Sequence, residues 1–294
     1  MSFREHLARQ QRIIDRELER LAPAESTRPE TIHRAMRYSL FAGGKRVRPV
    51  LCMEAARAIC DAPRGIETAA CSLEFIHTYS LIHDDLPALD NDDYRRGKLT
   101  SHKVFGEAMA ILAGDALLTL AFETLATMDS VTDDRKTRVI AELATAAGTV
   151  GGMIGGQVAD LEGEGKPPDA QLLATIHHAK TGALLRASVR MGAIYAGASK
   201  QQLDAMSRYG EHVGLAFQIV DDILDVEQSS ESLGKTAGKD AQQKKITFPA
   251  VYGLAESRRM AESERLSAHR ALDTFGERAG RLRELADLIV QRKS

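Results

Sequence analysis

The stretch CSLEFIHTYSLIHDDLPALDNDDYRRGKLTSHKVFG, residues 71–106, begins as an apolar helical pattern and ends in a cluster of acids. Apolar residues recur at three- and four-residue steps up to His83, which predicts a helix. Carboxylates crowded this closely repel one another, so an ordered cluster needs cations, and Mg²⁺ or Ca²⁺ suit oxygen ligands best. An acidic run taken alone is more often a solvated helix end. The charged residues in question are Asp84, Asp85, Asp90, Asp92, Asp93, Arg95 and Arg96.

A second acidic group lies in FQIVDDILDV, residues 217–226. Asp221, Asp222 and Asp225 interrupt an apolar helical pattern, and Asp221 and Asp225 share a face because they are four residues apart. Carboxylates in such surroundings are seldom left uncompensated. We therefore expect the two acidic groups to form opposite walls of one cavity, where Mg²⁺ would hold a diphosphate between them.

The rest of the chain predicts an all-α fold in a single domain, residues 1–294. Proline is scarce, at 8 residues, and no stretch shows the sustained alternation of a strand. No linker rich in proline, glycine or serine separates two halves. Helices are expected at 3–21, 29–42, from Pro49 onward, 106–129, 134–160, across LLATIHHAKTGALLRASVRMGAIYAG, and at 246–274 and 277–292.

Composition excludes several classes of partner. With 39 basic and 41 acidic side chains the net charge is −2, so no global field attracts nucleic acid or an anionic membrane. The longest apolar run, AMAILAGDALLTLAF, is broken by Gly114 and Asp115, and the first twelve residues lack the apolar core of a signal peptide. The three cysteines form no CxxC pair. We therefore expect a reduced, cytoplasmic protein that does not insert into membranes.

A basic turn, Gly43-Gly44-Lys45-Arg46-Val47-Arg48, lies between the second and third expected helices. Its glycines allow a sharp turn, and Lys45 and Arg48 suit phosphate oxygens. Alternatively, these cations merely complement a helix dipole. If metal holds one diphosphate, this turn is the natural place for a second.

These patterns resemble a known family. DDLPALD at 84–90 followed by Arg95 and Arg96, and DDILD at 221–225, resemble the two aspartate-rich motifs of the trans-isoprenyl diphosphate synthases. HTYSLIHDD, GGKRVRP and KKITFP resemble the bacterial short-chain branch, whose product is farnesyl diphosphate. The resemblance covers about residues 43–249. It implies a homodimer that joins isopentenyl diphosphate to dimethylallyl or geranyl diphosphate through an allylic cation, with three Mg²⁺ ions.

The resemblance also implies a role for each candidate residue. The expected metal ligands are Asp84, Asp85, Asp90 and Asp221. Isopentenyl diphosphate would be bound by Lys45, Arg48, His77 and Arg96. The allylic diphosphate would be bound by Arg95, Lys180, Lys235 and Lys245, the last two from a basic loop at 227–245 that fits a mobile lid. Catalytic roles fall to Lys180, Thr181 and Gln218, with the last two beside the reacting carbon. Asn91 stands where relatives commonly carry aspartate, which predicts an altered metal affinity.

Two geometric expectations concern the first motif. On a regular helix Asp84 and Asp90 would lie about 120° apart. Pro87 interrupts the helix, so we predict an irregular turn at 86–90 that returns Asp90 toward Asp84. A prenyl chain anchored at Asp84 would run down the preceding helix past Ser80 and meet Tyr79. The resemblance implies that it stops there at fifteen carbons.

Other functions remain open at this point. A geranyl or geranylgeranyl diphosphate synthase would differ only in product length. A class I terpene cyclase would leave the basic turn unexplained. A ferritin-like di-metal bundle could use Glu30-Thr-Ile-His33 and Glu74-Phe-Ile-His77 but would leave both aspartate groups idle. A helical partner subunit without activity would not need both groups.

Overall fold

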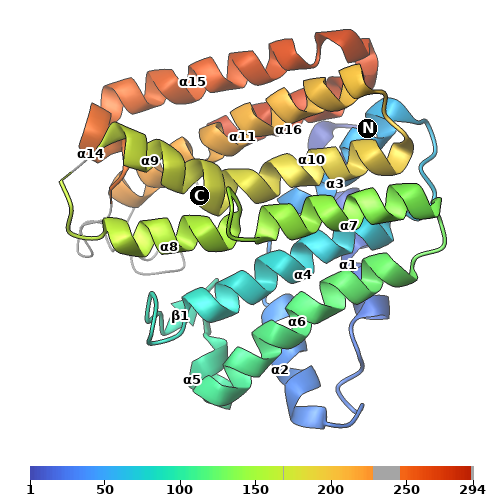
Figure 1. Cartoon of the computed structure of the whole chain (residues 1–294), viewed down its shortest axis with the longest axis vertical. Coiled ribbons are helices and arrows are strands. Elements are labelled where there is room, and N and C mark those ends of the chain that lie inside the picture. Colours follow the sequence, from blue (N-terminus) through green and yellow to red (C-terminus); the bar gives the residue numbers. More distant parts are fainter. Residues whose placement is uncertain (168, 228–245, 293–294) are drawn as a thin grey trace.

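The chain folds into a bundle of packed α-helices in a computed structural model that describes residues 1–167, 169–227 and 246–292 (Figure 1). The all-α prediction is therefore confirmed. The helices of the first half are α1 (Phe3–Leu21), α2 (Glu30–Leu40), α3 (Val47–Ile59), α4 (Ile66–Asp84), α5 (Ser101–Phe105) and α6 (Glu107–Thr127). Between α4 and α5 a short antiparallel hairpin pairs β1 (Tyr94–Arg95) with β2 (Lys98–Leu99), Tyr94 lying opposite Leu99.

The second half continues the bundle. Its helices are α7 (Asp133–Ala147), α8 (Met153–Gly163), α9 (Ala170–His177), α10 (Ala183–Ala196), α11 (Lys200–Glu227), α14 (Phe248–Tyr252), α15 (Leu254–Ala271) and α16 (Gly280–Gln291). A π-helical turn, His178–Gly182, joins α9 to α10, and a 3₁₀ segment, Asp273–Ala279, precedes α16. In Figure 1 the hairpin after α4 lies at the same end of the bundle as α8, α9 and α14.

Helix α4 is buried on every side. Leu73, Phe75 and Ile76 point in different directions around it, and all three are fully buried. A helix that is apolar all round belongs in a core. It packs against α3 and α6 (Figure 1), so the acids at its carboxyl end are delivered into the protein rather than onto its surface.

Two of the expected helices are each broken at glycine. The prediction of one helix over 134–160 is wrong, because α7 ends at Ala147 and α8 begins at Met153. Gly151 in the connecting turn has φ +66°, which a residue with a side chain rarely adopts. The helix expected at 246–274 is likewise divided by Gly253, at φ +79°, into α14 and α15.

Helix α6 is the one element among the described residues that is long and apolar enough to cross a membrane by length and composition alone. It packs against α4, and 39% of its apolar window is buried in the bundle. Its outer face keeps Ile111 and Leu112 exposed, at 44% and 50%. A helix that contributes to a protein core can pass the same test, so this observation alone does not indicate a membrane span.

Candidate active site

The two aspartate groups line one cavity of about 610 Å³. Asp84 and Asp90 form one part of its wall, and Asp221, Asp222 and Asp225 of α11 form another. The prediction that both groups share a cavity is therefore confirmed. The volume lies within the usual range for small-molecule sites. Lys180 and Thr181 of the π-helical turn and Gln218 of α11 also line it.

The first motif leaves the helix where Pro87 predicted. Helix α4 ends at Asp84, and the backbone N–H of Asp90 donates to the carbonyl of Asp84 at 2.8 Å. Asn91, at φ +50°, donates its N–H to the carbonyl of Leu86 at 3.1 Å. This tight turn returns Asp90 to the level of Asp84, which confirms the predicted irregularity.

The adjacent acids Asp84 and Asp85 have different surroundings. Burial, with the negative charge of Asp90 nearby, raises the pKa of Asp84 to about 6. The Asp85 carboxylate accepts two hydrogen bonds from Nε of Arg95, at 2.7 and 2.9 Å, and does not line the cavity. Asp92 also lies near Arg95, at 3.7 Å. The metal-ligand role of Asp85 stays a prediction, and its pairing with Arg95 argues against it.

The carboxylates that face the cavity suit Mg²⁺ better than a metal enclosed by protein. Among the described residues no group of three or more His, Cys, Asp or Glu side chains is close enough to hold a metal unaided. Mg²⁺ needs only one or two protein carboxylates and completes its shell with water and phosphate oxygens. Burial raises the pKa of Asp84 even though the positive charge of Lys180 acts in the opposite direction, so a bound cation would favour its ionised form. Asp84, Asp90 and Asp221 are therefore the residues that would hold Mg²⁺ with a diphosphate.

Three of the four residues expected to bind isopentenyl diphosphate, Arg48, His77 and Arg96, form a basic pocket beside the acids. Burial lowers the pKa of Arg48 to about 10, and its Nε is buried without a hydrogen-bond partner. Burial and the cations Arg48 and Arg96 hold the pKa of His77 well below its usual range. A neutral imidazole beside two guanidinium groups can donate a hydrogen bond to an anion. The expected grouping of Arg48, His77 and Arg96 is found along the cavity wall.

Lys45, in the turn that precedes α3, does not line the cavity, but it lies close enough for the charges of Asp221 and Arg292 to act on it. Burial and the neighbouring Arg292 lower the pKa of Lys45. Arg96 donates from Nη1 to the carbonyl of Gly43. Gly44 has φ +142°, which residues with a side chain rarely adopt, and a Cβ there would also lie 2.9 Å from Nη1 of Arg96, so glycine is favoured where the turn meets this arginine.

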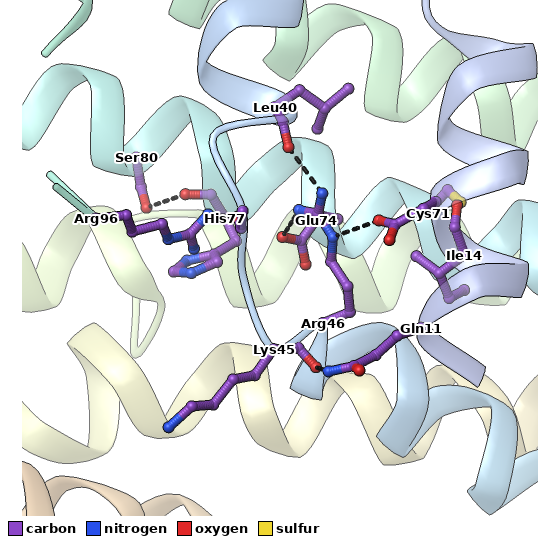
Figure 2. A network of polar contacts seen from close by, with 12 residues as sticks. Gln11, Ile14, Leu40, Lys45, Arg46, Cys71, Glu74, His77, Ser80 and Arg96 are labelled. Atoms are coloured by element: carbon purple, nitrogen blue, oxygen red, sulfur yellow. Dashed lines mark hydrogen bonds and ion pairs between the residues drawn. The ribbon is translucent and has the colours of Figure 1, made fainter. Parts of the chain in front are cut away.

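Arg46 anchors the basic turn instead of lining the cavity. Its guanidinium donates to Glu74 at 2.6 Å, to Asp15 at 2.9 Å and to the carbonyl of Leu40 at 2.9 Å. Arg46 and Glu74 are 4% and 2% exposed, and a buried pair in which each guanidinium nitrogen donates a hydrogen bond fixes the geometry of the turn firmly. Figure 2 shows Lys45 and Arg46 diverging from the turn, with Arg46 directed to Glu74.

Lys180 and Thr181 lie on the π-helical turn between α9 and α10. Such turns insert one extra residue and often occur at functional sites. A Cβ at Gly156 would lie 2.1 Å from the backbone nitrogen of Lys180, so this glycine lets α8 approach the turn closely. The ammonium of Lys180 donates to Asp160 of α8 at 2.6 Å. The sequence offered no charge partner for Lys180 on its own helix, and the structure supplies one from another.

Asp222 connects three parts of the site. Its carboxylate accepts hydrogen bonds from the Gln218 side chain at 2.8 Å and from the backbone N–H of Phe248 at 2.9 Å. Nε2 of His177 lies 3.4 Å away, and the His177 ring stacks on Phe248. At 3% exposure Asp222 is a buried support for Gln218 and for the start of α14.

The predicted stop for the prenyl chain lies on α4. Tyr79 and Ser80 both line the cavity. Tyr79 is 5% exposed, its hydroxyl has no hydrogen-bond partner, and its ring lies edge-on to His83 at 5.7 Å. The Ser80 hydroxyl donates to the carbonyl of His77 at 2.9 Å. A ring held there can limit the depth of the cavity below Asp84.

Sequence reasoning missed two polar residues that pair with site residues, Asp160 with Lys180 and Arg292 with Asp221. It considered Glu74 only for a di-metal site, whereas Glu74 pairs with Arg46 of the basic turn. Asp160 follows a glycine-rich segment at helical spacing, and Glu74 precedes His77 by three residues, so both carried a weak signal. Arg292, which follows α16, carried none, because nothing in the sequence brings the chain end to the second motif. Lys235 and Lys245 lie outside the described residues.

The arrangement separates two anion subsites of different character. Carboxylates surround one, where a metal-bound diphosphate would lie, and cations surround the other. Bound Mg²⁺ would supply the charge that makes a diphosphate a leaving group. The carboxylate of Asp222 is engaged by neutral donors, which leaves the amide of Gln218 and the hydroxyl of Thr181 as neutral dipoles in the cavity wall. Such neutral dipoles stabilise a cation without trapping it as a nucleophile would.

Comparison with known proteins agrees with this geometry. The polyprenyl synthetase family model matches residues 29–282. A dimethylallyltranstransferase of Fischerella ambigua is 50% identical over 98% of this chain and 83% of its own length. The large subunit 1 of the heterodimeric geranylgeranyl pyrophosphate synthase of Arabidopsis thaliana is 46% identical over 99% of this chain and 80% of its own length.

Solved structures extend the likeness to the fold. The FPP/GFPP synthase of Zymomonas mobilis superposes with a TM-score of 0.88 at 36% identity, covering 98% of both chains. The geranylgeranyl pyrophosphate synthetase of Pyrococcus horikoshii superposes with a TM-score of 0.89 at 30% identity, covering 99% of this chain and 98% of the other. With the family model spanning most of its length and both acid walls in place, the chain belongs to the polyprenyl synthetase family, the trans-prenyltransferases that its two motifs resemble.

Proposed function

We propose that this protein is a Mg²⁺-dependent prenyltransferase that adds isopentenyl diphosphate to dimethylallyl and then geranyl diphosphate, releasing farnesyl diphosphate and pyrophosphate. The observation that carries the proposal is the cavity itself. Asp84 and Asp221 line it from different helices, and Arg48, His77 and Arg96 form a basic pocket that lines the same cavity. Two diphosphates of different fate need two such subsites.

The residues act in sequence. Asp84, Asp90 and Asp221 would hold Mg²⁺ with the allylic diphosphate, while Lys45, Arg48, His77 and Arg96 would orient isopentenyl diphosphate. When the allylic C–O bond breaks, Thr181 and Gln218 offer neutral dipoles to the carbon that becomes cationic. The double bond of isopentenyl diphosphate attacks that carbon, and the departing diphosphate takes the proton that is then lost.

Tyr79 supports fifteen carbons as the product length. It is a bulky ring on the same helix as Asp84, in the direction in which a chain anchored at that carboxylate extends. Geranylgeranyl diphosphate is the second candidate product, because relatives of 46–48% identity carry the name geranylgeranyl diphosphate synthase. The position and size of Tyr79 favour the shorter chain.

The decisive experiment incubates the purified protein with Mg²⁺, isopentenyl diphosphate and either dimethylallyl or geranyl diphosphate, and sizes the products by chromatography. We expect farnesyl diphosphate from both allylic substrates. Tyr79→Ala with excess isopentenyl diphosphate should lengthen the product. Tyr79→Phe keeps the ring and removes a hydroxyl that has no partner, so it should leave the length unchanged.

The outcomes separate the candidates. Twenty-carbon product from the unmodified protein favours the geranylgeranyl assignment, and unchanged length in Tyr79→Ala removes Tyr79 from this role. Consumption of farnesyl diphosphate alone, without isopentenyl diphosphate, would indicate a terpene cyclase. No product from any of these substrates would contradict prenyl transfer.

The proposal includes a cytoplasmic homodimer. The outer face of α6 exposes Ile111 and Leu112 beside the half-buried Leu118 and Phe122, and a second copy would cover this apolar strip. Leu112→Glu should shift the mass measured by light scattering toward the monomer, and an unchanged dimer would place the interface elsewhere. Cys52, Cys60 and Cys71 are free thiols, which suits a reducing compartment.

A further inference from the structure

Arg292, which directly follows α16, reaches the second aspartate motif. Its Nη2 donates to Asp221 Oδ1 at 3.0 Å and to the carbonyl of Phe217 at 2.8 Å. Its guanidinium carbon lies 3.9 Å from the centre of the Phe217 ring, a cation–π contact. With its side chain 13% exposed, this arginine is held on two sides by α11.

The same arginine borders the basic pocket. Burial lowers the pKa of both Lys45 and Arg48, and the positive charge of Arg292 acts in the same direction on each, so the three cations lie within electrostatic reach of one another. Asp221 is the acid that all three share. Nε of Arg292 is buried and has no hydrogen-bond partner, which leaves one donor of the fork for another acceptor. Arg292 therefore stands between an acid of one subsite and the cations of the other.

Two ligands would change the contacts that Arg292 makes: Mg²⁺ would compete with it for Asp221, and a diphosphate would attract it away from Asp221. Asp221 is an expected ligand of Mg²⁺, and a cation already bonded to its carboxylate opposes a second one. A diphosphate among Lys45 and Arg48 would instead attract the arginine, whose planar fork binds phosphate oxygens well. Movement of the guanidinium toward that diphosphate would free Asp221 for the metal.

We propose that Arg292 couples the two subsites, bonding Asp221 in the unliganded protein and transferring to the homoallylic diphosphate when Mg²⁺ takes Asp221. The proposal rests on the proposed function for the identity of the two ligands. It assigns the arginine opposite effects on them: it weakens Mg²⁺ binding and strengthens isopentenyl diphosphate binding. Thermodynamic linkage then requires that isopentenyl diphosphate and Mg²⁺ each improve the binding of the other.

The test uses the full chain and Arg292→Met, which keeps much of the apolar stem and removes the charge. Mg²⁺ is titrated by calorimetry in the presence of geranyl thiolodiphosphate, whose leaving group departs slowly, with and without isopentenyl diphosphate. We expect Mg²⁺ to bind Arg292→Met at least about fivefold more tightly than the unmodified protein, a typical size for coupling between two sites. The KM for isopentenyl diphosphate should rise about tenfold. The improvement in Mg²⁺ binding on adding isopentenyl diphosphate should disappear.

Two further variants guard against a general loss of structure. Arg283 lies on α16 itself, where it donates to the carbonyls of Gly276 and Leu272 away from the cavity. Arg283→Met should leave both affinities unchanged even if it lowers the melting temperature. Arg292→Lys retains the charge without the planar fork and should keep Mg²⁺ affinity near that of the unmodified protein.

Weaker or unchanged Mg²⁺ binding in Arg292→Met would overturn the proposal, because a merely structural role weakens both ligands together. Arg292→Met should also be compared with the unmodified protein by thermal unfolding. If Arg292→Met does not fold, Arg292→Lys tests the proposal instead. Because lysine lacks the planar fork, adding isopentenyl diphosphate should no longer improve Mg²⁺ binding in this variant. Failure of the unmodified protein to make prenyl products would refute the proposed function, whereas the calorimetric comparison judges Arg292 separately.

Discussion

Each of the two aspartate groups begins with a pair of adjacent aspartates, but different local structures position their side chains. The first lies where a buried helix ends, and a turn held by the Asp90 N–H and the Asp84 carbonyl places its acids. The second lies inside the continuous helix α11, where helical spacing alone places Asp221 and Asp225. One acid wall depends on loop geometry and the other on helix periodicity.

Within each pair of adjacent aspartates, Asp84–Asp85 and Asp221–Asp222, the second side chain is held by hydrogen bonds from the protein. The first acid of each pair, Asp84 or Asp221, lines the cavity. The second acid is held by protein donors: Asp85 by Arg95, and Asp222 by Gln218 and the Phe248 N–H. Both second acids are nearly buried, at 4% and 3% exposure. In each pair the second acid therefore fixes the neighbouring structure, although Asp222 also lines the cavity. The first acids differ, because Asp221 accepts a hydrogen bond from Arg292 that a metal would have to displace.

Removing the available acids should give the largest effect. Asp84→Ala and Asp221→Ala should each lower kcat/KM for prenyl transfer about 100- to 1,000-fold, comparable to the loss of one preorganised transition-state contact. The measurement is steady-state turnover at saturating Mg²⁺. A loss of tenfold or less in either variant would contradict the assignment of that aspartate as a ligand of Mg²⁺.

Asp93→Ala is the matched control. Asp93 belongs to the same acidic run, but it pairs with Lys103 at 2.8 Å and its side chain is 55% exposed. It does not line the cavity. Its removal should change turnover less than about threefold, since exposed ion pairs contribute little.

Much of this architecture could be predicted from the residues. The apolar pattern before Asp84 and the proline at 87 were enough to predict a helix followed by a returning turn. The glycines at 151 and 253 were present in the sequence, but periodicity continued across them, so the helix breaks were missed. Asp160 and Arg292 could not be paired with their partners, because contacts between distant helices depend on packing that no local pattern encodes. Asp85 and Asp222 occupy positions in the aspartate motifs that also suit metal ligands, and only their hydrogen-bond partners in the structure distinguish them from Asp84 and Asp221.

A smaller effect should follow from weakening the second acid of the α11 pair. Asp222→Asn keeps the shape but replaces one acceptor oxygen with an amide donor, so either Gln218 or the Phe248 N–H loses its partner. We expect kcat to fall about tenfold while the Mg²⁺ concentration for half-maximal activity stays unchanged. The free energy of unfolding should fall by about 1–3 kcal/mol, the usual cost of a buried unsatisfied group.

The Mg²⁺ dependence distinguishes the two roles. Asp221→Asn should raise the Mg²⁺ requirement, because it removes charge from an expected ligand. If Asp222→Asn raises it as much, Asp222 is a ligand and the division of labour within the pairs is wrong. Chemical denaturation of both variants supplies the stability comparison.

The smallest expected effect is a pH dependence specific to the first wall. In the metal-free protein burial and the charge of Asp90 raise the pKa of Asp84 from 3.8 to about 6, so the folded state binds this proton more tightly than the unfolded chain does. The resulting contribution to stability is fully present below about pH 4 and is lost as pH rises through 6.

Asp84→Asn keeps a neutral side chain at every pH. In the presence of a chelator, the variant should therefore gain stability relative to the unmodified protein between pH 5 and pH 7, as measured by urea unfolding. Mg²⁺ requires the ionised carboxylate and should restore the unmodified protein at pH 7 more than at pH 5. If the two proteins differ in free energy of unfolding by the same amount at pH 5 and pH 7, the charge of ionised Asp84 is already balanced in the metal-free protein. The first aspartate group would then not need a bound cation.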